Sequence, residues 1–211
     1  SDWSAGIGHL REDFGQRSFA YDDRTVASAS WRGGISDTFT GEAHAEGGGG
    51  LAQAGIGGWW LLGGAGVFNA AYAHSDYHDL RGGQWALGYS WNNRRLNFNL
   101  RSVRSHGDYR DLGALQGNLP PSISEQATVG ADLLRLGTLS ASYLRLRYPD
   151  GDDNRYASLF WSRTWSQRWS AYLSVNQNLD KSDDRSIYLS VTASLGNNRQ
   201  ASLSSKRNGD S

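Results

Sequence analysis

The 211-residue sequence contains no cysteine and no methionine, and it has only three prolines. Without cysteine, the chain has neither a disulfide nor a thiolate metal ligand. No segment approaches the roughly 18 apolar residues that a transmembrane helix requires, and the mean hydropathy is −0.60. These absences exclude a disulfide-stapled domain and a helical membrane protein. What is abundant instead is glycine, with 27 residues, together with nine tryptophans and ten tyrosines, which suits many short strands.

Charge of one sign is also lacking, because 21 basic residues balance 21 acidic ones. A nucleic-acid-binding protein needs a clustered basic face, so we expect no nucleic-acid partner. Basic and acidic residues alternate in the polar connections, which argues against attachment to a membrane through a polybasic segment.

Short connections alternate along the chain with longer polar ones. Short turns are expected at 33–34, 63–64, 92–93, 136–137, 167–168 and 197–198. Longer connections are expected at 11–24, 46–51, 75–83, 105–122, 149–155 and 180–185. This alternation is typical of a transmembrane β-barrel, which has short periplasmic turns and long external loops.

The strands themselves alternate between apolar and polar residues, most clearly along 84–91 and 187–195. Residues two apart on a strand share one face of a sheet. We predict that one face meets lipid and its interfaces through Trp85, Leu87, Tyr89, Trp91, Trp169, Leu173, Ile187, Leu189 and Val191. We predict that the other face lines an aqueous lumen through Glu42, His44, Glu46, Ser90, Asn97, Asn99, Arg101, Asp132, Ser170, Ser174 and Ser190.

The fold class predicted from these patterns is all-β, an antiparallel up-and-down transmembrane β-barrel with about 12–14 strands in this chain. The expected strands are 2–10, 25–32, 38–46, 51–61, 66–74, 83–91, 95–104, 124–134, 138–148, 155–165, 168–179, 186–195 and 199–206. That set has an odd number of members, whereas bacterial single-chain barrels have an even number. We therefore expect residues 1–211 to form a single β-barrel segment, part of a larger barrel, without a separate plug or periplasmic domain.

Candidate chemistry is sparse. His74, Asp76 and His78 alternate at the end of an expected strand and are the candidate ligands for zinc or nickel. The sequence marks no fourth ligand, so solvated strand-end residues are the favoured interpretation and no metal or cofactor is predicted. No serine lies in a Gly-x-Ser-x-Gly motif, and the glycines at 47–50 lack the Lys-Ser/Thr of a phosphate-binding loop. We therefore do not expect an enzyme.

Several segments resemble the fimbrial outer-membrane ushers of chaperone–usher pilus assembly. The segments are 41–47 (GEAHAEG), 82–89 (GGQWALGY), 107–112 (GDYRDL), 124–127 (SEQA), 136–140 (LGTLS) and 198–202 (NRQAS). They follow one another in order along essentially the whole chain. The chain is similar to the barrel segment that follows the plug of that family, beginning at 2–6 (DWSAG).

The resemblance implies an outer-membrane translocation pore of a Gram-negative bacterium that assembles and secretes pilus subunits. Its partners would be outer-membrane lipid and complexes of a periplasmic chaperone with pilus subunits. Two alternatives remain open: a general or solute-specific outer-membrane porin, and a soluble β-rich adhesin or binding domain. An isolated barrel segment exposes unpaired strand edges, so self-association of the segment is also expected.

Overall fold

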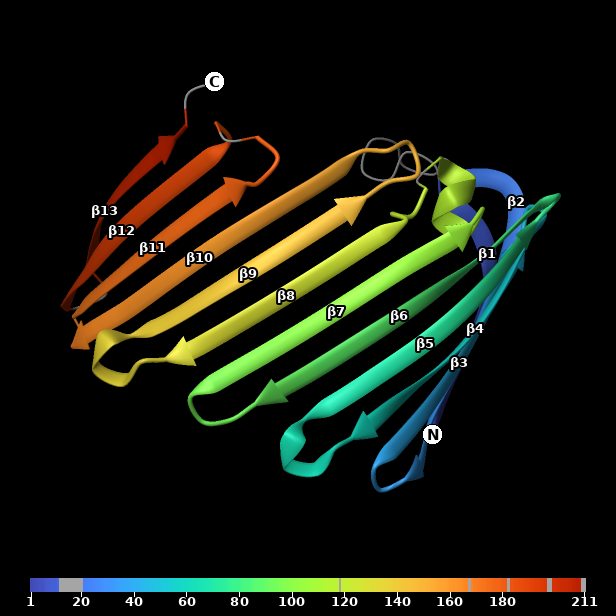
Figure 1. Cartoon of the computed structure of the whole chain (residues 1–211), viewed down its shortest axis with the longest axis horizontal. Coiled ribbons are helices and arrows are strands. Elements are labelled where there is room, and N and C mark those ends of the chain that lie inside the picture. The colour runs from blue at the N-terminus through green and yellow to red at the C-terminus, as the bar shows by residue number, and fades with distance from the viewer. Residues whose placement is uncertain (12–20, 118, 167, 182, 197–198, 210–211) are drawn as a thin grey trace. The chain divides into compact units, whose positions relative to one another are not determined.

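The computed structural model describes residues 1–11, 21–117, 119–166, 168–181, 183–196 and 199–209. This part of the chain forms thirteen β-strands and three short 3-10 helices (Figure 1). The strands are β1 (Asp2–Arg11), β2 (Tyr21–Ser36), β3 (Phe39–Gly48), β4 (Leu51–Leu61), β5 (Val67–Tyr77), β6 (Leu80–Asn92), β7 (Leu96–Gly107), β8 (Ile123–Asp132), β9 (Thr138–Arg147), β10 (Asp153–Ser166), β11 (Trp169–Asn178), β12 (Arg185–Gly196) and β13 (Arg199–Asn208). The 3-10 helices are η1 (Gly63–Ala65), η2 (Leu112–Gln116) and η3 (Leu134–Leu136).

The order of the strands in the sheet is their order in the chain, from β1 to β13. The strand pairs are antiparallel, as in β3 with β4 and in β11 with β12. This is the predicted up-and-down arrangement, and each of the thirteen predicted strands corresponds to one strand of the structure.

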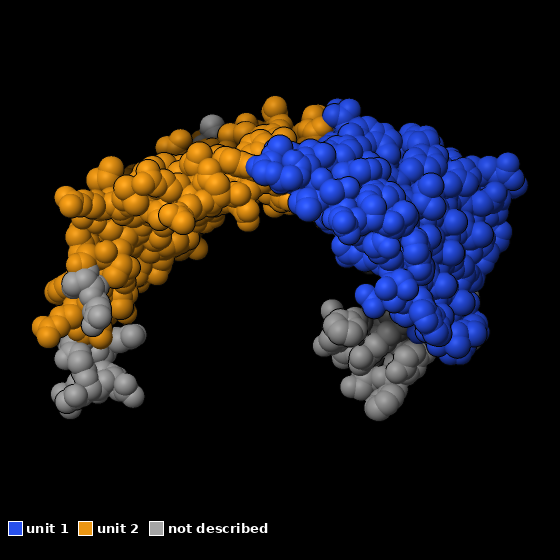
Figure 2. Space-filling model, turned by 90° about the horizontal axis from the view of Figure 1, so that it is seen from below, with its two compact units in different colours: residues 1–89, 102–124, 147–151 blue, residues 90–101, 125–146, 152–211 orange. Residues whose placement is uncertain are grey.

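The chain divides into two units, which are coloured separately in Figure 2. Unit 1 comprises residues 1–89, 102–124 and 147–151 and contains β1 to β5 and most of β6. Unit 2 comprises residues 90–101, 125–146 and 152–211 and contains β10 to β13.

Two of the predicted short turns have the same construction. The amide of Leu62 donates to the carbonyl oxygen of Gly66 at 2.8 Å, and that of Leu133 donates to Gly137 at 2.8 Å. Each turn contains a 3-10 helix and ends on a glycine with positive φ, 99° at Gly66 and 90° at Gly137. L-residues with a side chain rarely adopt such angles, which explains the glycine at the end of both turns.

The structure corrects two predictions about glycine-rich segments. Residues 33–34 were predicted as a turn, but they continue β2 and pair with Gly41 and Thr40 of β3. The predicted long connection at 46–51 is also wrong, because the ladder between β3 and β4 runs to the pair of Gly48 with Leu51. Only Gly49 and Gly50 are left to turn, with φ values of 60° and 86°. Two consecutive positive φ angles are typical of a type I′ turn, whose backbone twist matches that of the two strands it joins.

The predicted long connection at 75–83 is likewise shorter, since β5 ends at Tyr77 and β6 begins at Leu80. Long connections do join β7 to β8, across residues 108–122, and β11 to β12, across residues 179–184. Three predicted connections lie wholly or partly outside the described residues: most of the loop at 11–24, the turn at 197–198, and residue 167 of the turn at 167–168.

Large apolar side chains on one face of the strands are exposed. Exposed fractions reach 80% for Trp3, 80% for Ile7 and 71% for Ile56. The buried residues of unit 1 include Leu51, at the start of β4, and Tyr109, beyond the end of β7. Extended exposed apolar surface marks a face that meets a membrane or a partner.

In the part of the chain that the structure describes, no helix has the length and apolar character needed to cross a bilayer.

Candidate functional site: the polar face of the sheet

In unit 1 the register brings the predicted polar residues of β3 onto one face. Glu42, His44 and Glu46 stand opposite Gly57, Gly55 and Gln53 of β4, respectively. His44 Nε2 lies 3.2 Å from Glu46 Oε2. Gln53 in turn pairs with Ser75 of β5. This face of β1 to β6 is the polar face of unit 1.

A hollow of about 460 Å³ lies on the polar face of unit 1. Its floor is made of residues with minimal side chains, namely Gly55, Ala71, Ala73 and Ala86. Because these residues project at most a methyl group, the hollow results from missing side-chain volume. Gln53 also lines it, together with other polar residues that include His44 and Gln84.

Arg32 and Glu42, which line the hollow, both contact Trp59. The Arg32 guanidinium lies 5.2 Å from the centre of the Trp59 ring. Trp59 Nε1 donates to Glu42 Oε2 at 3.2 Å. Arg32 pairs in the sheet with both Asp2 of β1 and Glu42 of β3. Arg32 therefore has an acidic residue opposite it on each neighbouring strand.

The connection between β7 and β8 is attached to the same face. Gln53 Nε2 donates to the Tyr109 hydroxyl oxygen at 2.8 Å. The Arg110 amide donates to Ser75 Oγ at 2.8 Å, and the Leu112 amide donates to Glu46 Oε1 at 3.0 Å. Glu46, Gln53 and Ser75 form one row across β3, β4 and β5, so the connection is bound by three adjacent strands.

Burial of Tyr109 depends on a glycine on β6. A Cβ atom at Gly82 would overlap the backbone nitrogen of Tyr109. Burial raises the pKa of Tyr109 to about 12, and the charges of Asp111 and Glu46 act in the same direction, against the hydrogen bond from Gln53. The phenol therefore remains a neutral, buried hydrogen-bonding group.

Sequence reasoning did not find the attachment of residues 108–117 to the strands. The local signal is a capped 3-10 turn, in which Asp111 Oδ1 accepts from the Ala114 amide at 3.0 Å and Gly117 ends η2 with φ of 86°. Asp at a cap and Gly at the following left-handed position mark an ordered turn.

Unit 2 has a polar face of its own. Ser174 stands opposite Phe160 of β10 and Tyr188 of β12, while Ser170 stands opposite Thr164 and Thr192. Ser190 pairs with Tyr172. The predicted positions Ser170, Ser174 and Ser190 therefore share one face.

Three aromatic rings also lie on that face, an arrangement that sequence reasoning missed. The ring centres of Phe160 and Tyr172 are 6.5 Å apart, and those of Tyr172 and Tyr188 are 6.1 Å apart. They are diagonal neighbours across β10, β11 and β12. The polar face of unit 2 is therefore hydroxyl-rich with an aromatic row, and not made of small groups alone.

The remaining predicted lumen residues follow the same alternation. The Asn97 amide covers Gly130 of β8, where a Cβ atom would lie 2.5 Å from Asn97 Nδ2. Asn99 and Arg101 are on the face of β7 that carries Asn97, and Asp132 is on the face of β8 that carries Gly130. Along β6, Ser90 shares the parity of Ala86 in the hollow.

The predicted apolar positions occupy the opposite face. Leu173 pairs with Leu189, and Val191 and Ile187 pair with Ala171 and Val175. Trp169 is 53% exposed and Leu189 is 44% exposed.

On β6, Trp85, Leu87, Tyr89 and Trp91 alternate with the polar-face residues of that strand. The Arg104 guanidinium lies 5.6 Å from the centre of the Trp85 ring. The Tyr89 hydroxyl donates to the carbonyl oxygen of Ala65 at 2.5 Å, next to a short turn.

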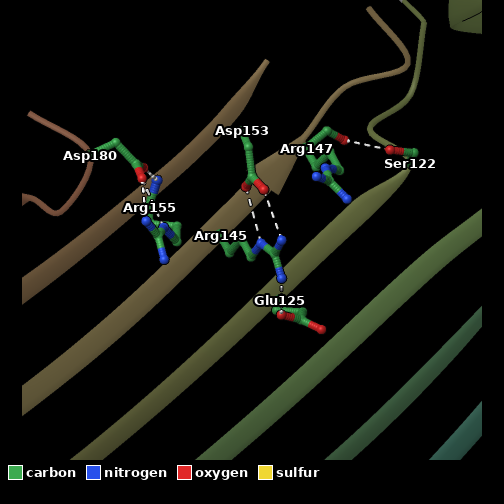
Figure 3. A network of polar contacts seen from close by, with 7 residues as sticks. All are labelled: Ser122, Glu125, Arg145, Arg147, Asp153, Arg155 and Asp180. Carbon is green, nitrogen blue, oxygen red and sulfur yellow. Dashed lines mark hydrogen bonds and ion pairs between the residues drawn. The ribbon is translucent and has the colours of Figure 1, made fainter. Parts of the chain in front are cut away.

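Ion pairs connect the ends of the strands in unit 2, as Figure 3 shows. Arg145 donates to both carboxylate oxygens of Asp153 at 3.0 and 2.8 Å and lies 3.7 Å from Glu125. Arg155 contacts Asp180 through its guanidinium at 2.6 Å and its amide at 2.7 Å. The hydrogen bonds from Arg155 hold the pKa of the Asp180 carboxyl below its usual value.

The metal candidates are not brought together as a ligand set. Asp76 Oδ2 accepts from Arg81 Nε at 2.8 Å, and the His78 ring packs against Tyr77 with centres 4.5 Å apart. Within the described residues, no group of three or more His, Asp or Glu side chains is arranged to hold a metal ion.

Comparison with solved structures identifies similar folds. An assembly intermediate of the Escherichia coli P pilus tip, PapC–PapD–PapK–PapG, matches with a TM-score of 0.77 and 20% identity over 97% of this chain and 27% of that one. The translocation pore of the P pilus usher PapC matches with a TM-score of 0.69 and 19% identity over 97% of this chain and 44% of that one. A mutant Rh. blastica porin matches more weakly, with a TM-score of 0.46 and 9% identity over 99% of this chain and 95% of that one.

The chain thus spans less than half the length of the usher chains that it matches. No protein-family profile matches it, and no curated protein sequence matches it significantly. The strand order and the usher comparisons confirm the predicted fold class: the chain has an all-β, antiparallel, up-and-down fold of the kind found in transmembrane β-barrels.

Proposed function

We propose that this chain forms part of the wall of an outer-membrane pore, in a Gram-negative bacterium, that translocates pilus subunits delivered by a periplasmic chaperone. The observation that carries the proposal is the agreement of its thirteen-strand arrangement with usher pores over 97% of the chain. The usher-like segments found in the sequence support the same role.

In this proposal the two faces of the sheet meet different solvents. The face with Leu173, Leu189 and Trp169 contacts lipid and its interfaces, where apolar strand residues flanked by aromatics are expected. The polar faces of the two units line an aqueous lumen, where serine and asparagine side chains present hydrated groups to a passing protein. The connections at 108–122 and 179–184 lie outside, and the turns at the other ends of these strands lie on the periplasmic side.

The proposal is tested with membranes that contain the full-length protein carrying this chain. Chaperone–subunit complexes are added, and the subunits that become accessible on the far side are measured, with chaperone alone as the control. Export of subunits is the expected result. A correctly inserted protein that neither binds nor exports any subunit would contradict the proposal.

A general or solute-specific porin is the second candidate, supported by the hydroxyl-rich polar face of unit 2. Liposomes containing this chain alone distinguish the two functions, since a porin conducts without any further segment.

A soluble β-rich adhesin or binding domain would instead be monodisperse without detergent. The isolated chain is expected to self-associate through β1 and β13, the two strands at the ends of the strand order. Crosslinking in detergent measures this self-association.

A further inference from the structure

An arginine lies on the apolar face of unit 2. Arg163 of β10 pairs with Ala171 of β11, which pairs in turn with Val191 of β12. By alternation along β10, Arg163 shares this face with Trp161 and Trp165. A charged side chain in contact with lipid tails is destabilising unless water or a counter-charge reaches it. The position of Arg163 therefore requires an explanation.

Two tryptophans position the guanidinium of Arg163 but do not neutralise it. The ring centres of Trp161 and Trp165 are 6.2 Å apart, and the guanidinium carbon lies 5.0 Å from the centre of the Trp165 ring. Trp161 Nε1 donates to the carbonyl oxygen of Leu136 at 2.8 Å, which fixes this ring beside the turn between β8 and β9. A cation–π contact attracts the guanidinium to the ring, but the positive charge remains.

Acidic side chains do not neutralise this charge either. Within the part of the chain that the structure describes, Arg163 forms no ion pair. The ion pairs of β10, at Asp153 and Arg155, lie at the opposite end of the strand. Arg163 is half-buried, and a guanidinium offers several N–H donors and no acceptor. It is therefore complementary to an anion from outside the chain.

The turn beside Arg163 contributes a second cation. A Cβ atom at Gly137 would lie 2.8 Å from Arg163 Cβ, so the turn at Leu133–Gly137 lies against Arg163. Arg135 is exposed in this turn, whereas its acidic residue, Asp132, accepts a hydrogen bond from the turn backbone at 2.9 Å.

Both turns at this end of β9 and β10 are basic. Residues 132–137 and 163–169 contain three arginines and one aspartate, a net formal charge of plus two. Exposed apolar side chains accompany these charges, since Leu134 is 62% exposed and Leu136 is 61% exposed. Cations bordered by exposed leucine and tryptophan match an occupant that has both an anionic group and a hydrocarbon part.

We propose that Arg163 and Arg135, with Trp161 and Trp165, bind the phosphate group of an anionic phospholipid whose acyl chains lie along the apolar face. A guanidinium binds phosphate oxygens through paired hydrogen bonds, and tryptophan rings favour the level of the headgroups. The site is continuous with the face proposed to contact lipid, which favours a lipid over a soluble anion. The inference rests on the proposed pore, and it adds a preference for the lipids that surround this wall.

Native mass spectrometry of the full-length protein in detergent tests the proposal independently of export. The probes are dioleoyl phosphatidylglycerol and dioleoyl phosphatidylcholine, which have the same acyl chains but differ in net charge. Arg163→Gln is expected to retain one phosphatidylglycerol molecule fewer than the wild type. The affinity for that molecule should fall about fivefold, the contribution of one interfacial arginine, and phosphatidylcholine binding should not change.

Arg101→Gln is the matched control, because it removes the same charge from the polar face of β7 and should leave the binding of both lipids unchanged. Should Arg163→Gln not fold, Arg135→Gln at the exposed turn removes the second cation and should also weaken phosphatidylglycerol binding.

Equal wild-type affinity for both lipids, equal loss in Arg101→Gln, or no loss in either site variant would overturn the proposal. Displacement of phosphatidylglycerol by inorganic phosphate at the same concentration would also overturn it, because the site would then bind a soluble anion. Either result in a protein that exports subunits leaves the pore intact. Selective binding through Arg163 in a protein that exports nothing would instead contradict the pore alone.

Discussion

Gln53 in β4 donates a hydrogen bond to the hydroxyl of Tyr109 at 2.8 Å, across a sequence separation of 56 residues. Together with the bonds from the Arg110 and Leu112 amides, it holds the connection after β7 on the polar face of unit 1. If this face lines a pore, the attached connection narrows the passage beside the hollow. In that case the strength of the attachment affects passage through the pore.

Tyr109→Phe removes this hydrogen bond and leaves the buried amide of Gln53 without a partner. The expected loss is about 1–3 kcal/mol, expressed as opening of residues 108–117. Limited proteolysis should then cut this connection at least fivefold faster. Tyr156→Phe, at an exposed tyrosine of β10, is the matched control and should not change the rate. Equal cleavage of both variants would show that the bond does not hold the connection.

Alkali should open the same connection in a defined range. The pKa of Tyr109 is raised to about 12 by burial, so the folded state favours the neutral phenol. Its contribution to stability is present below about pH 10, the ordinary tyrosine value, and is lost as the pH rises through about 12. The midpoint of the Tyr109 titration is measured from the tyrosinate absorbance near 295 nm, as the difference between the wild type and Tyr109→Phe. A difference midpoint at the ordinary value would contradict the burial.

Gly82→Ala should displace the connection by steric overlap, because a Cβ atom at this position would overlap the Tyr109 nitrogen. Overpacking of this kind costs about 1–3 kcal/mol. Gly34→Ala is the control, since its Cβ atom would have no atom within 4 Å. The thermal unfolding of the two variants, Gly82→Ala and Gly34→Ala, is compared by electrophoresis, in which folded protein is recognised by its mobility. A smaller loss for Gly82→Ala than for Gly34→Ala would rule out the close approach.

Acid should loosen the connection between β11 and β12. Because hydrogen bonds from Arg155 lower the pKa of Asp180, this carboxylate stabilises the folded state above the ordinary aspartate pKa. The contribution is lost as the pH falls through the lowered value. The Arg155 amide donates to Asp180 at 2.7 Å, so its protection from hydrogen exchange, relative to the intrinsic rate at each pH, should fall on acidification. In Asp180→Asn that fall in protection should disappear, and its persistence would assign the effect to another group.

The strands were predictable because period-two alternation is a local property. Leu189 and Ser190 are successive apolar and polar residues in the sequence, and they lie on opposite faces of β12. The glycine at position 137 predicts the turn at Leu133–Gly137. The prediction of turns and loops at Gly33 and Gly48 was wrong, because both glycines continue a strand. Gly33 pairs with β3 and Gly48 pairs with β4, and it is this pairing that decides whether a glycine bends the chain. The attachment of Tyr109 and the row of Phe160, Tyr172 and Tyr188 depend on register and on contacts between distant segments. No local pattern encodes those.

One face of the strands is expected to meet lipid and the other water. The chain has no cysteine, so single cysteines at Leu189, Ser190, Val191 and Thr192 of β12 can each carry a nitroxide label in a reconstituted full-length protein from which any cysteine outside this chain has been removed. Collision rates with oxygen, which partitions into lipid, and with a water-soluble nickel chelate measure the surroundings of each label. We expect high oxygen accessibility at Leu189 and Val191 and high nickel accessibility at Ser190 and Thr192. Four labels with the same ratio, or the opposite alternation, would contradict this expectation.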